Sequence, residues 1–383
     1  MLTQIYNGNI LTPEGWVKRG SVYFADGRIV EVTRSSNIND KTEQAIDAQG
    51  MNVVPGGIEL HCHGGGGRDY MEGTEEAFRT ATLTHMRHGT TAMFPTLSSA
   101  TLPMIEMACE TCDKLMREPD TAIMGLHLEG PYFNPRKAGA QMPDIIRLPD
   151  PDEYHHIIED YDCVRRWDAA PELPGALEFG HYITDKGVVA AIGHTNAEYP
   201  EVKAAFDEGY THTTHFYNGM PGFHNVREFK HAGTVESVYL LDGMSVEIIA
   251  DGIHVPLPIL RLVHRMKGVE RTALVTDALA VTDSDSDKAF DPRVIIEDGV
   301  CKLSDRSALA GSIATMDRLI RTMVMQAGIP LHDAVRMASE TPARIMGIYD
   351  RKGSLQRGKD ADILILDDNC NLKAVYAMGK LVQ

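Results

Sequence analysis

The strongest constraint on the fold is a unit that recurs eight times in the middle of the chain. Each unit begins with a short apolar or β-branched run, continues with a polar loop and usually ends in a helix-like stretch of about 10 to 15 residues. The runs begin near Asn52, Thr90, Ala122, Asp162, Val188, His212, Ser245 and Arg271. Eight strand-then-helix units over roughly 300 residues are typical of an α/β fold, the (β/α)8 TIM-like barrel. No repeat of fixed period is visible, which disfavours a solenoid.

Both ends of the chain differ from this pattern, because they contain short strands and turns without helical stretches. We therefore expect a small β-sandwich domain built from residues 1–50 and 350–383, and a barrel domain at residues 51–349. The acidic, serine-rich stretch 281–291, with turns at Gly299 and Asp305, predicts an inserted loop or hairpin after the eighth strand.

The charge balance and the cysteine content limit the partners and the compartment. The chain has 37 Lys and Arg against 54 Asp and Glu, a net charge of −17. This balance argues against a nucleic-acid partner, because phosphate backbones bind clustered basic residues. No stretch reaches the roughly 18 to 20 apolar residues of a membrane span, and residues 1–9 lack a signal-peptide pattern. Six cysteines are too few for a disulfide framework. We expect a cytoplasmic protein that binds neither nucleic acid nor membrane.

The first apolar run ends in two histidines that are one residue apart, His61 and His63. In an extended chain, residues i and i+2 point to the same side, so both imidazoles can reach one metal ion. An incidental pair is the alternative interpretation. The four glycines at Gly64–Gly67 favour a functional one, because they allow the backbone or a ligand to approach closely.

Four more ionisable residues stand where later runs end. Glu129 follows the third run, His194 the fifth, His215 the sixth and Asp277 the eighth. The C-terminal ends of barrel strands converge on one mouth, where active sites lie. Each residue alone is compatible with a surface or core position, but together with the first-strand histidines they predict a metal site.

Other histidines are assigned to packing or to the surface. His85 and His88 lie three residues apart on a helix-like segment, which indicates packing or surface positions. His127 is expected either to support Glu129 or to fill the barrel.

The pattern H-x-H on the first strand, His on the fifth and sixth strands and Asp on the eighth resembles the amidohydrolase superfamily of metal-dependent hydrolases. Five further segments resemble, in order, the N-acetylglucosamine-6-phosphate deacetylase family. They are HLEGP at 127–131, GHT at 193–195, THFYNGM at 214–220, ADGIH at 250–254 and LAGS at 309–312. The resemblance covers the whole chain, and GKDAD at 358–362 adds a less specific match.

The resemblance implies a metal centre with six protein ligands. They are His61, His63 and Asp277 for one divalent ion, Glu129 as a bridge, and His194 and His215 for a second ion. One or two ions per chain are expected; zinc suits the mixed imidazole and carboxylate donors, and iron, manganese and cobalt are alternatives. Asp277 is also the expected catalytic residue, which accepts a proton from water and passes it to the leaving amine.

The resemblance further implies five substrate-binding residues, which are Gln141, Asn218, Gly219, Arg227 and His254. Arg227 would bind the sugar phosphate, which a guanidinium can hold through two hydrogen bonds. In this family the arginine is expected to reach the site of a neighbouring subunit, so the resemblance also implies a homodimer. A surface salt bridge of Arg227 with Glu228 or Glu236 is the alternative.

Two departures from the family pattern leave the hexosamine epimer open. Gln141 stands where some members have a histidine thought to polarise the acetyl carbonyl, and Gln141 could still donate one amide hydrogen bond. Gly219 stands where many members have alanine, which changes the sugar pocket slightly.

The expected reaction is hydrolysis of N-acetylglucosamine 6-phosphate to glucosamine 6-phosphate and acetate. Three alternatives remain. The first is the galacto epimer of this substrate. The second is another amidohydrolase reaction, such as that of a cyclic amidase, an N-acyl-amino-acid deacylase or a nucleobase deaminase. The third is an inactive scaffold of the same fold. A phosphate-binding pair of Arg227 and His254 would favour the phosphorylated sugar.

Overall fold

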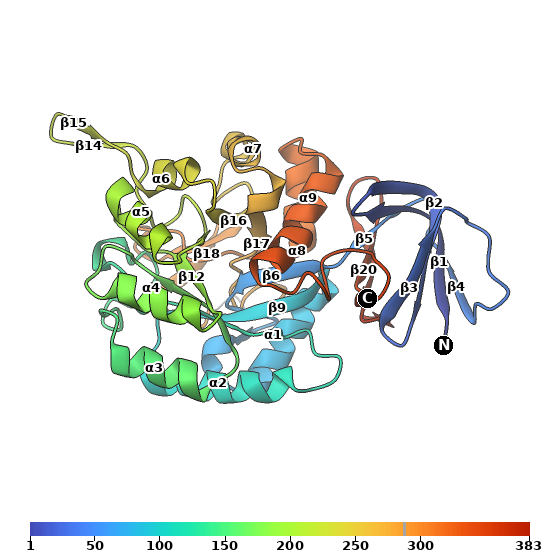
Figure 1. Ribbon diagram of the computed structural model, residues 1–383, viewed down its shortest axis with the longest axis horizontal. Helices are drawn as coiled ribbons and strands as arrows, with labels where there is room; N and C mark the ends of the chain where they lie inside the picture. The colour runs from blue at the N-terminus through green and yellow to red at the C-terminus, as the bar shows by residue number, and fades with distance from the viewer. Residues whose placement is uncertain (286–288) are drawn as a thin grey trace.

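The computed structural model describes residues 1–285 and 289–383, and it contains the expected barrel (Figure 1). Eight parallel strands follow one another around the barrel in chain order. They are β6 (Gly57–Cys62), β9 (Thr90–Leu97), β10 (Leu126–Glu129), β11 (Val164–Ala169), β12 (Val189–Ile192), β13 (His212–Thr213), β16 (Ser245–Ile249) and β17 (Thr272–Val275). The predicted barrel fold is confirmed.

The barrel closes between its first and last strands. The backbone N–H of Asp277, just beyond β17, donates to the carbonyl of His61 on β6 at 2.9 Å. The N–H of His63 donates to the carbonyl of Ala278 at 2.8 Å. The end of the eighth strand therefore lies directly beside the two histidines of the first.

Helices surround the barrel strands (Figure 1). They are α1 (Glu75–Arg87), α2 (Leu102–Met116), α3 (Pro151–Asp160), α4 (Ala176–Asp185), α5 (Tyr199–Asp207), α6 (Thr234–Leu240), α7 (Leu257–Met266), α8 (Met316–Arg321), α9 (Leu331–Ala338) and α10 (Glu340–Ile345). Short helical turns occur at η1 (Tyr70–Glu72), before α1, and at η2 (Pro135–Lys137) and η3 (Val269–Arg271), and a π-helical turn, η4 (Thr322–Gln326), extends α8. No helix within residues 1–285 and 289–383 combines the length and apolar character needed to cross a membrane.

A second sheet of eight strands combines the two ends of the chain (Figure 1). Its strands are β1 (Thr3–Thr12), β2 (Gly15–Ala25), β3 (Arg28–Thr33), β4 (Gln44–Asp47), β5 (Asn52–Pro55), β20 (Ile363–Leu366), β21 (Leu372–Ala377) and β22 (Lys380–Leu381). The central strand β5 pairs in parallel with β1 and antiparallel with β20. Buried side chains such as Ile10, Val53 and Ile365 form the core of this sheet.

Three short hairpins lie in loops of the barrel domain within the described residues. β7 (Gly64–Gly65) pairs with β8 (Arg68–Asp69) directly after the first strand. β14 (His224–Val226) and β15 (Phe229–His231) form a hairpin that projects from the barrel, away from the terminal sheet (Figure 1). β18 (Val294–Glu297) and β19 (Val300–Leu303) form the hairpin predicted after the eighth strand. Part of the stretch predicted as an inserted loop, 286–288, lies outside the described residues.

The third barrel strand begins later than the sequence predicts. The apolar run starts at Ala122, but Ile123 makes only an isolated bridge to Met93 and the continuous strand starts at Leu126. Gly125, with φ +159°, interrupts the run between these two points. The strand nevertheless ends at Glu129, as expected.

Candidate functional site

The six residues predicted as metal ligands lie together at the C-terminal mouth of the barrel. Each is at most 7% exposed, and each lies at the end of its strand or within two residues beyond it. They are His61 and His63 at β6, Glu129 at β10, His194 after β12, His215 after β13 and Asp277 after β17. The barrel thus gathers ionisable groups that are up to about 200 residues apart in the sequence.

Three of these residues have a backbone conformation that side chains other than glycine rarely adopt. The φ angles are +44° at His194, +26° at His215 and +49° at Asp277. Such conformations cost roughly 1–3 kcal/mol each and persist where the surrounding structure enforces them. All three occur immediately after a strand, where the chain turns, and the side chains meet in one cluster.

The first group of possible metal donors comprises His61, His63 and Glu129, whose donor atoms lie within 4.8 Å of one another. The Nε2 atoms of the two histidines are 3.2 Å apart. Asp277 stands at the edge of this group, with its Oδ1 3.1 Å from His63 Nε2 and 3.5 Å from His61 Nε2.

The second group shares Glu129 and adds His194 and His215. The Oε1 atom of Glu129 lies 3.1 Å from His194 Nε2 and 3.0 Å from His215 Nε2. The Nε2 atoms of these two histidines are 3.0 Å apart. One carboxylate therefore stands between two pairs of imidazoles, an arrangement that can hold two neighbouring cations.

The outward hydrogen bonds of the rings fit a metal at their inner nitrogens. His194 donates from Nδ1 to the carbonyl of Lys137 at 2.8 Å, and His215 donates from Nδ1 to the carbonyl of Asn218 at 3.1 Å. A neutral imidazole that donates through Nδ1 keeps a lone pair at Nε2. The Nε2 lone pairs of His194 and His215 then face each other and the Glu129 carboxylate. These electron-rich atoms repel one another unless a cation lies between them.

Electrostatics also favour positive charge between the imidazoles. Burial opposes a charge on His61, but the surrounding carboxylates, Asp277 first, outweigh it and raise the pKa of this ring well above its usual value. Burial would raise the pKa of Glu129, yet the charge of His61 and hydrogen bonds from the other rings hold it well below the usual range. A divalent cation satisfies the same demand for positive charge.

A buried ionic network supports His61 from inside the barrel. Glu247 on β16 accepts a hydrogen bond from His61 Nδ1 at 2.6 Å and another from Arg166 on β11 at 3.1 Å. Arg166 also donates to Asp168 at 3.0 Å, and Asp168 lies 2.9 Å from His127 Nε2. All five side chains are completely buried. Glu247 thus orients the His61 ring, and His127 fills the barrel rather than supporting Glu129.

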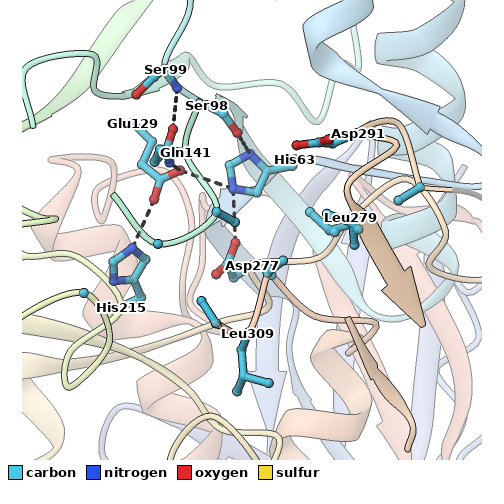
Figure 2. A pocket seen from close by; sticks show the side chains of 18 of the residues that line it. His63, Ser98, Ser99, Glu129, Gln141, His215, Asp277, Leu279, Asp291 and Leu309 are labelled. Carbon is cyan, nitrogen blue, oxygen red and sulfur yellow. Dashed lines mark hydrogen bonds and ion pairs between the residues drawn. The ribbon is translucent and has the colours of Figure 1, made fainter. Parts of the chain in front are cut away.

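A cavity of about 360 Å³ opens at the cluster, a size that suits a small-molecule ligand (Figure 2). Four of the predicted substrate contacts line it, namely Gln141, Asn218, Gly219 and His254. Asp251 accepts a hydrogen bond from His254 Nδ1 at 2.8 Å. The other ring nitrogen of His254 has no hydrogen-bond partner in the described part of the chain. This nitrogen is thus available to a ligand.

Gln141 contacts the cluster itself. Its Nε2 donates to Glu129 Oε2 at 2.7 Å, and its Oε1 accepts from the backbone N–H of Ser99 at 2.7 Å (Figure 2). The side chain therefore orients Glu129, and one of its two amide hydrogens remains for a substrate.

Arg227 stands apart from the other predicted substrate contacts. It lies exposed in the turn of the β14–β15 hairpin, with φ +55°, and does not line the cavity. Within residues 1–285 and 289–383 it forms no ion pair, so the alternative salt bridge with Glu228 or Glu236 is absent. A single copy of the chain does not bring Arg227 to the site.

Three buried charged residues that support the cluster from inside the barrel were not predicted. Arg166, Asp168 and Glu247 lie within strands rather than at their ends. A signal existed, because charged residues inside short apolar runs are expensive to bury unless they are paired. Their partners lie on other strands, so no local pattern identifies the pairs.

Comparisons with known proteins point to one family of enzymes. The Amidohydrolase family profile matches residues 52–382. N-acetylglucosamine-6-phosphate deacetylase of Bos taurus is 30% identical, over 98% of this chain and 92% of that protein. N-acetylgalactosamine-6-phosphate deacetylase of Escherichia coli O157:H7 is 29% identical, over 97% of each chain. The solved structure of a Mycobacterium smegmatis N-acetyl-D-glucosamine-6-phosphate deacetylase mutant, in complex with N-acetyl-D-glucosamine-6-phosphate, superposes with a TM-score of 0.90 at 31% identity, covering 100% of this chain and 99% of that one.

Proposed function

The chain belongs to the amidohydrolase family, and from this membership we propose that it hydrolyses N-acetylglucosamine 6-phosphate to glucosamine 6-phosphate and acetate. One observation carries the proposal. Glu129 lies between two pairs of imidazoles, with Asp277 at the edge, and the cluster opens into a cavity of ligand size. The galacto epimer is the second candidate, because a relative of similar identity bears that substrate's name.

We assign the metal ligands as the sequence analysis predicts. His61, His63 and Asp277 would hold one divalent ion, His194 and His215 a second, and Glu129 would bridge them. When bound, such ions polarise an amide carbonyl and make water acidic enough to attack at neutral pH. Zinc is the proposed metal, because it accepts mixed imidazole and carboxylate ligands.

Asp277 is the proposed proton carrier. It lines the cavity beside His63, and its pKa is lowered, because the neighbouring imidazoles outweigh the effect of burial. The carboxylate is therefore ionised at neutral pH and can accept a proton from the attacking water. The water oxygen bonds to the carbonyl carbon, the carbon–nitrogen bond breaks, and Asp277 returns the proton to the amine nitrogen.

Metal analysis tests the assignment of the ligands. Purified protein is expected to contain one to two divalent ions per chain, and removal by a chelator should abolish hydrolysis until zinc is restored. His194→Ala should lower the metal content, because it removes one donor of the second group. The exposed His181 offers a matched control, and His181→Ala should bind as much metal as wild type. Full activity in metal-free protein would contradict the assignment.

The β14–β15 hairpin supports the proposal of a homodimer in which Arg227 reaches the neighbouring site. Phe223, Val226 and Phe229, beside Arg227 in the chain, are 64%, 47% and 65% exposed. Large apolar side chains gathered on one projecting element are typical of an interaction surface. A second copy of the chain would cover them and receive the guanidinium in its own cavity, where Arg227 would bind the phosphate together with His254.

Arg227→Ala is expected to raise KM for the phosphorylated sugar about 10- to 100-fold, because hydrogen bonds to charged groups contribute roughly 1.5–3 kcal/mol. The exposed Lys230 on the same hairpin offers the control, and Lys230→Ala should leave KM nearly unchanged. Mixing Arg227→Ala with Asp277→Asn subunits should restore activity, because one site of the mixed dimer has both residues. An unchanged KM would contradict a role of Arg227 in substrate binding.

The reaction itself is tested by acetate release from three sugars. N-acetylglucosamine 6-phosphate should turn over fast, and unphosphorylated N-acetylglucosamine slowly or not at all. N-acetylgalactosamine 6-phosphate decides the epimer. If metal-loaded protein hydrolyses none of them, another amidohydrolase substrate must be sought.

We also propose that the enzyme acts in the cytoplasm. All six cysteines are free and buried in the structure. Free thiols are usual in a reducing compartment.

A further inference from the structure

Several large apolar side chains, together called the apolar wall, line the cavity. Leu309, Met142 and Phe290 are 37%, 47% and 51% exposed, and all three line the same cavity, as does the more sheltered Leu279. Large apolar groups left half exposed around one opening are typical of a surface that binds an apolar ligand.

Contacts around the cluster show on which side of it some of the lining residues lie. Asn218 and Gly219 lie on the side of the second metal group, because Asn218 accepts from the His215 ring and Gly219 approaches the ring of His194. Leu279 lies two residues beyond Asp277, on the side of it that faces away from His215 (Figure 2). Leu279 and the Asn218 side of the cavity, where we place the substrate's phosphate, therefore lie on opposite sides of Asp277.

We propose that this wall is an acyl-chain subsite, so that the enzyme also hydrolyses amides longer than acetyl, up to butyryl, from the same 6-phosphorylated amino sugar. The inference rests on the proposed function. With the phosphate held at the Asn218 side and the amide beside Asp277, the chain of the acyl group extends towards Leu279 and Leu309.

The chemistry is the same for every acyl group. The water oxygen bonds to the acyl carbon, the carbon–nitrogen bond breaks, and the proton passes through Asp277 to the nitrogen. The products are the free amino sugar phosphate and a short-chain carboxylate. Only the binding changes, because each methylene that leaves water for an apolar wall strengthens binding by a factor of about 4.

The first experiment compares kcat/KM for the N-acetyl, N-propionyl and N-butyryl amides of glucosamine 6-phosphate. All three release the same amine, so one assay serves the whole series. The N-butyryl compound should be hydrolysed within about tenfold of the N-acetyl compound. Turnover of the acetyl compound alone would overturn the subsite, whereas turnover of none would overturn the proposed function.

Two variants of Leu309 test the position of the subsite. Leu309→Trp fills the wall and should lower the butyryl-to-acetyl ratio of kcat/KM at least tenfold. Leu309→Ala removes apolar contacts without crowding the cavity, so it does not disturb the fold by overpacking. It should lower the same ratio by a factor of about 4. Leu262 on α7 is exposed to a similar extent, 40%, and Leu262→Trp is the matched control. Wild-type ratios in both Leu309 variants would overturn the proposal.

Binding provides a readout that does not depend on turnover. In the Asp277→Asn background, calorimetry should show that the N-butyryl compound binds at least as tightly as the N-acetyl compound. Adding Leu309→Trp should weaken binding of the N-butyryl compound more than binding of the N-acetyl compound. Weaker binding of the butyryl compound to the single variant would contradict an apolar subsite.

Discussion

Asp277→Asn is expected to lower kcat for deacetylation by roughly 10²- to 10⁴-fold, the usual contribution of a positioned acid–base group. The amide has the shape of the carboxylate and keeps one oxygen towards His63, from which Asp277 Oδ1 is 3.1 Å away. It cannot accept a proton from water at neutral pH. The loss should therefore appear in kcat more than in KM, and the variant should retain most of its metal.

The control for this variant is Asp291→Asn. Asp291 lines the same cavity, but both of its oxygens are bound by the guanidinium of Arg293, which leaves it no role in proton transfer. This variant should keep most of its activity. A nearly wild-type kcat for Asp277→Asn would remove Asp277 from the proposed role, and the proton carrier would have to be sought elsewhere in the cavity.

Arg166→Met should destabilise the fold by roughly 3–5 kcal/mol, the usual cost of removing one partner from a buried ion pair. The guanidinium is completely buried and donates to Asp168, Glu247 and Thr214. Without it, two buried carboxylates lose their cation. Because Glu247 orients His61, the variant should also bind metal more weakly. Denaturant unfolding, with metal content measured in parallel, checks both effects.

The strand that carries Arg166 also provides the control. Arg165 precedes it but is exposed, so Arg165→Met should change the free energy of unfolding by less than about 0.5 kcal/mol. The pH dependence gives a second check. In the wild type, Arg166 and neighbouring imidazoles outweigh burial and lower the pKa of Asp168 and Glu247, so these groups stabilise the fold above the unfolded pKa near 4. That contribution is lost as the pH falls. The free energies of unfolding of the wild type and of Arg166→Met should therefore become more alike in acid. A difference that grows in acid would contradict this account.

The barrel and the gathering of six ionisable residues at its mouth could be predicted because both depend on local patterns. Each cluster residue closes a recognisable apolar run, and the fold rule that brings strand ends to one mouth then places His61 near Asp277 without further information. The same rule could not predict which charged side chains pair with each other inside the barrel. Arg166 and Glu247 lie on strands β11 and β16, which are not neighbours in the sheet, so their pairing emerges only when the barrel closes.

Loops limited the prediction in a different way. Gln141 lies between η2 and α3, in a segment without periodicity, and its contacts with Glu129 and Ser99 depend on the path of that loop. Arg227 illustrates another limit. Its segment can be matched to a family motif, but its position on a projecting hairpin separates it from the cavity of its own chain.

The terminal sheet has a consequence for how the molecule is made. Strand β5 leads directly into the first barrel strand, and it is flanked by β1 from the start of the chain and by β20 from its end. The partners on β20 are synthesised roughly 300 residues after β5, so this pairing has a high contact order and forms slowly. During translation, one edge of β5 therefore stays without its partner until β20 leaves the ribosome. Truncation of the final 20 or so residues would expose that edge permanently and favour aggregation.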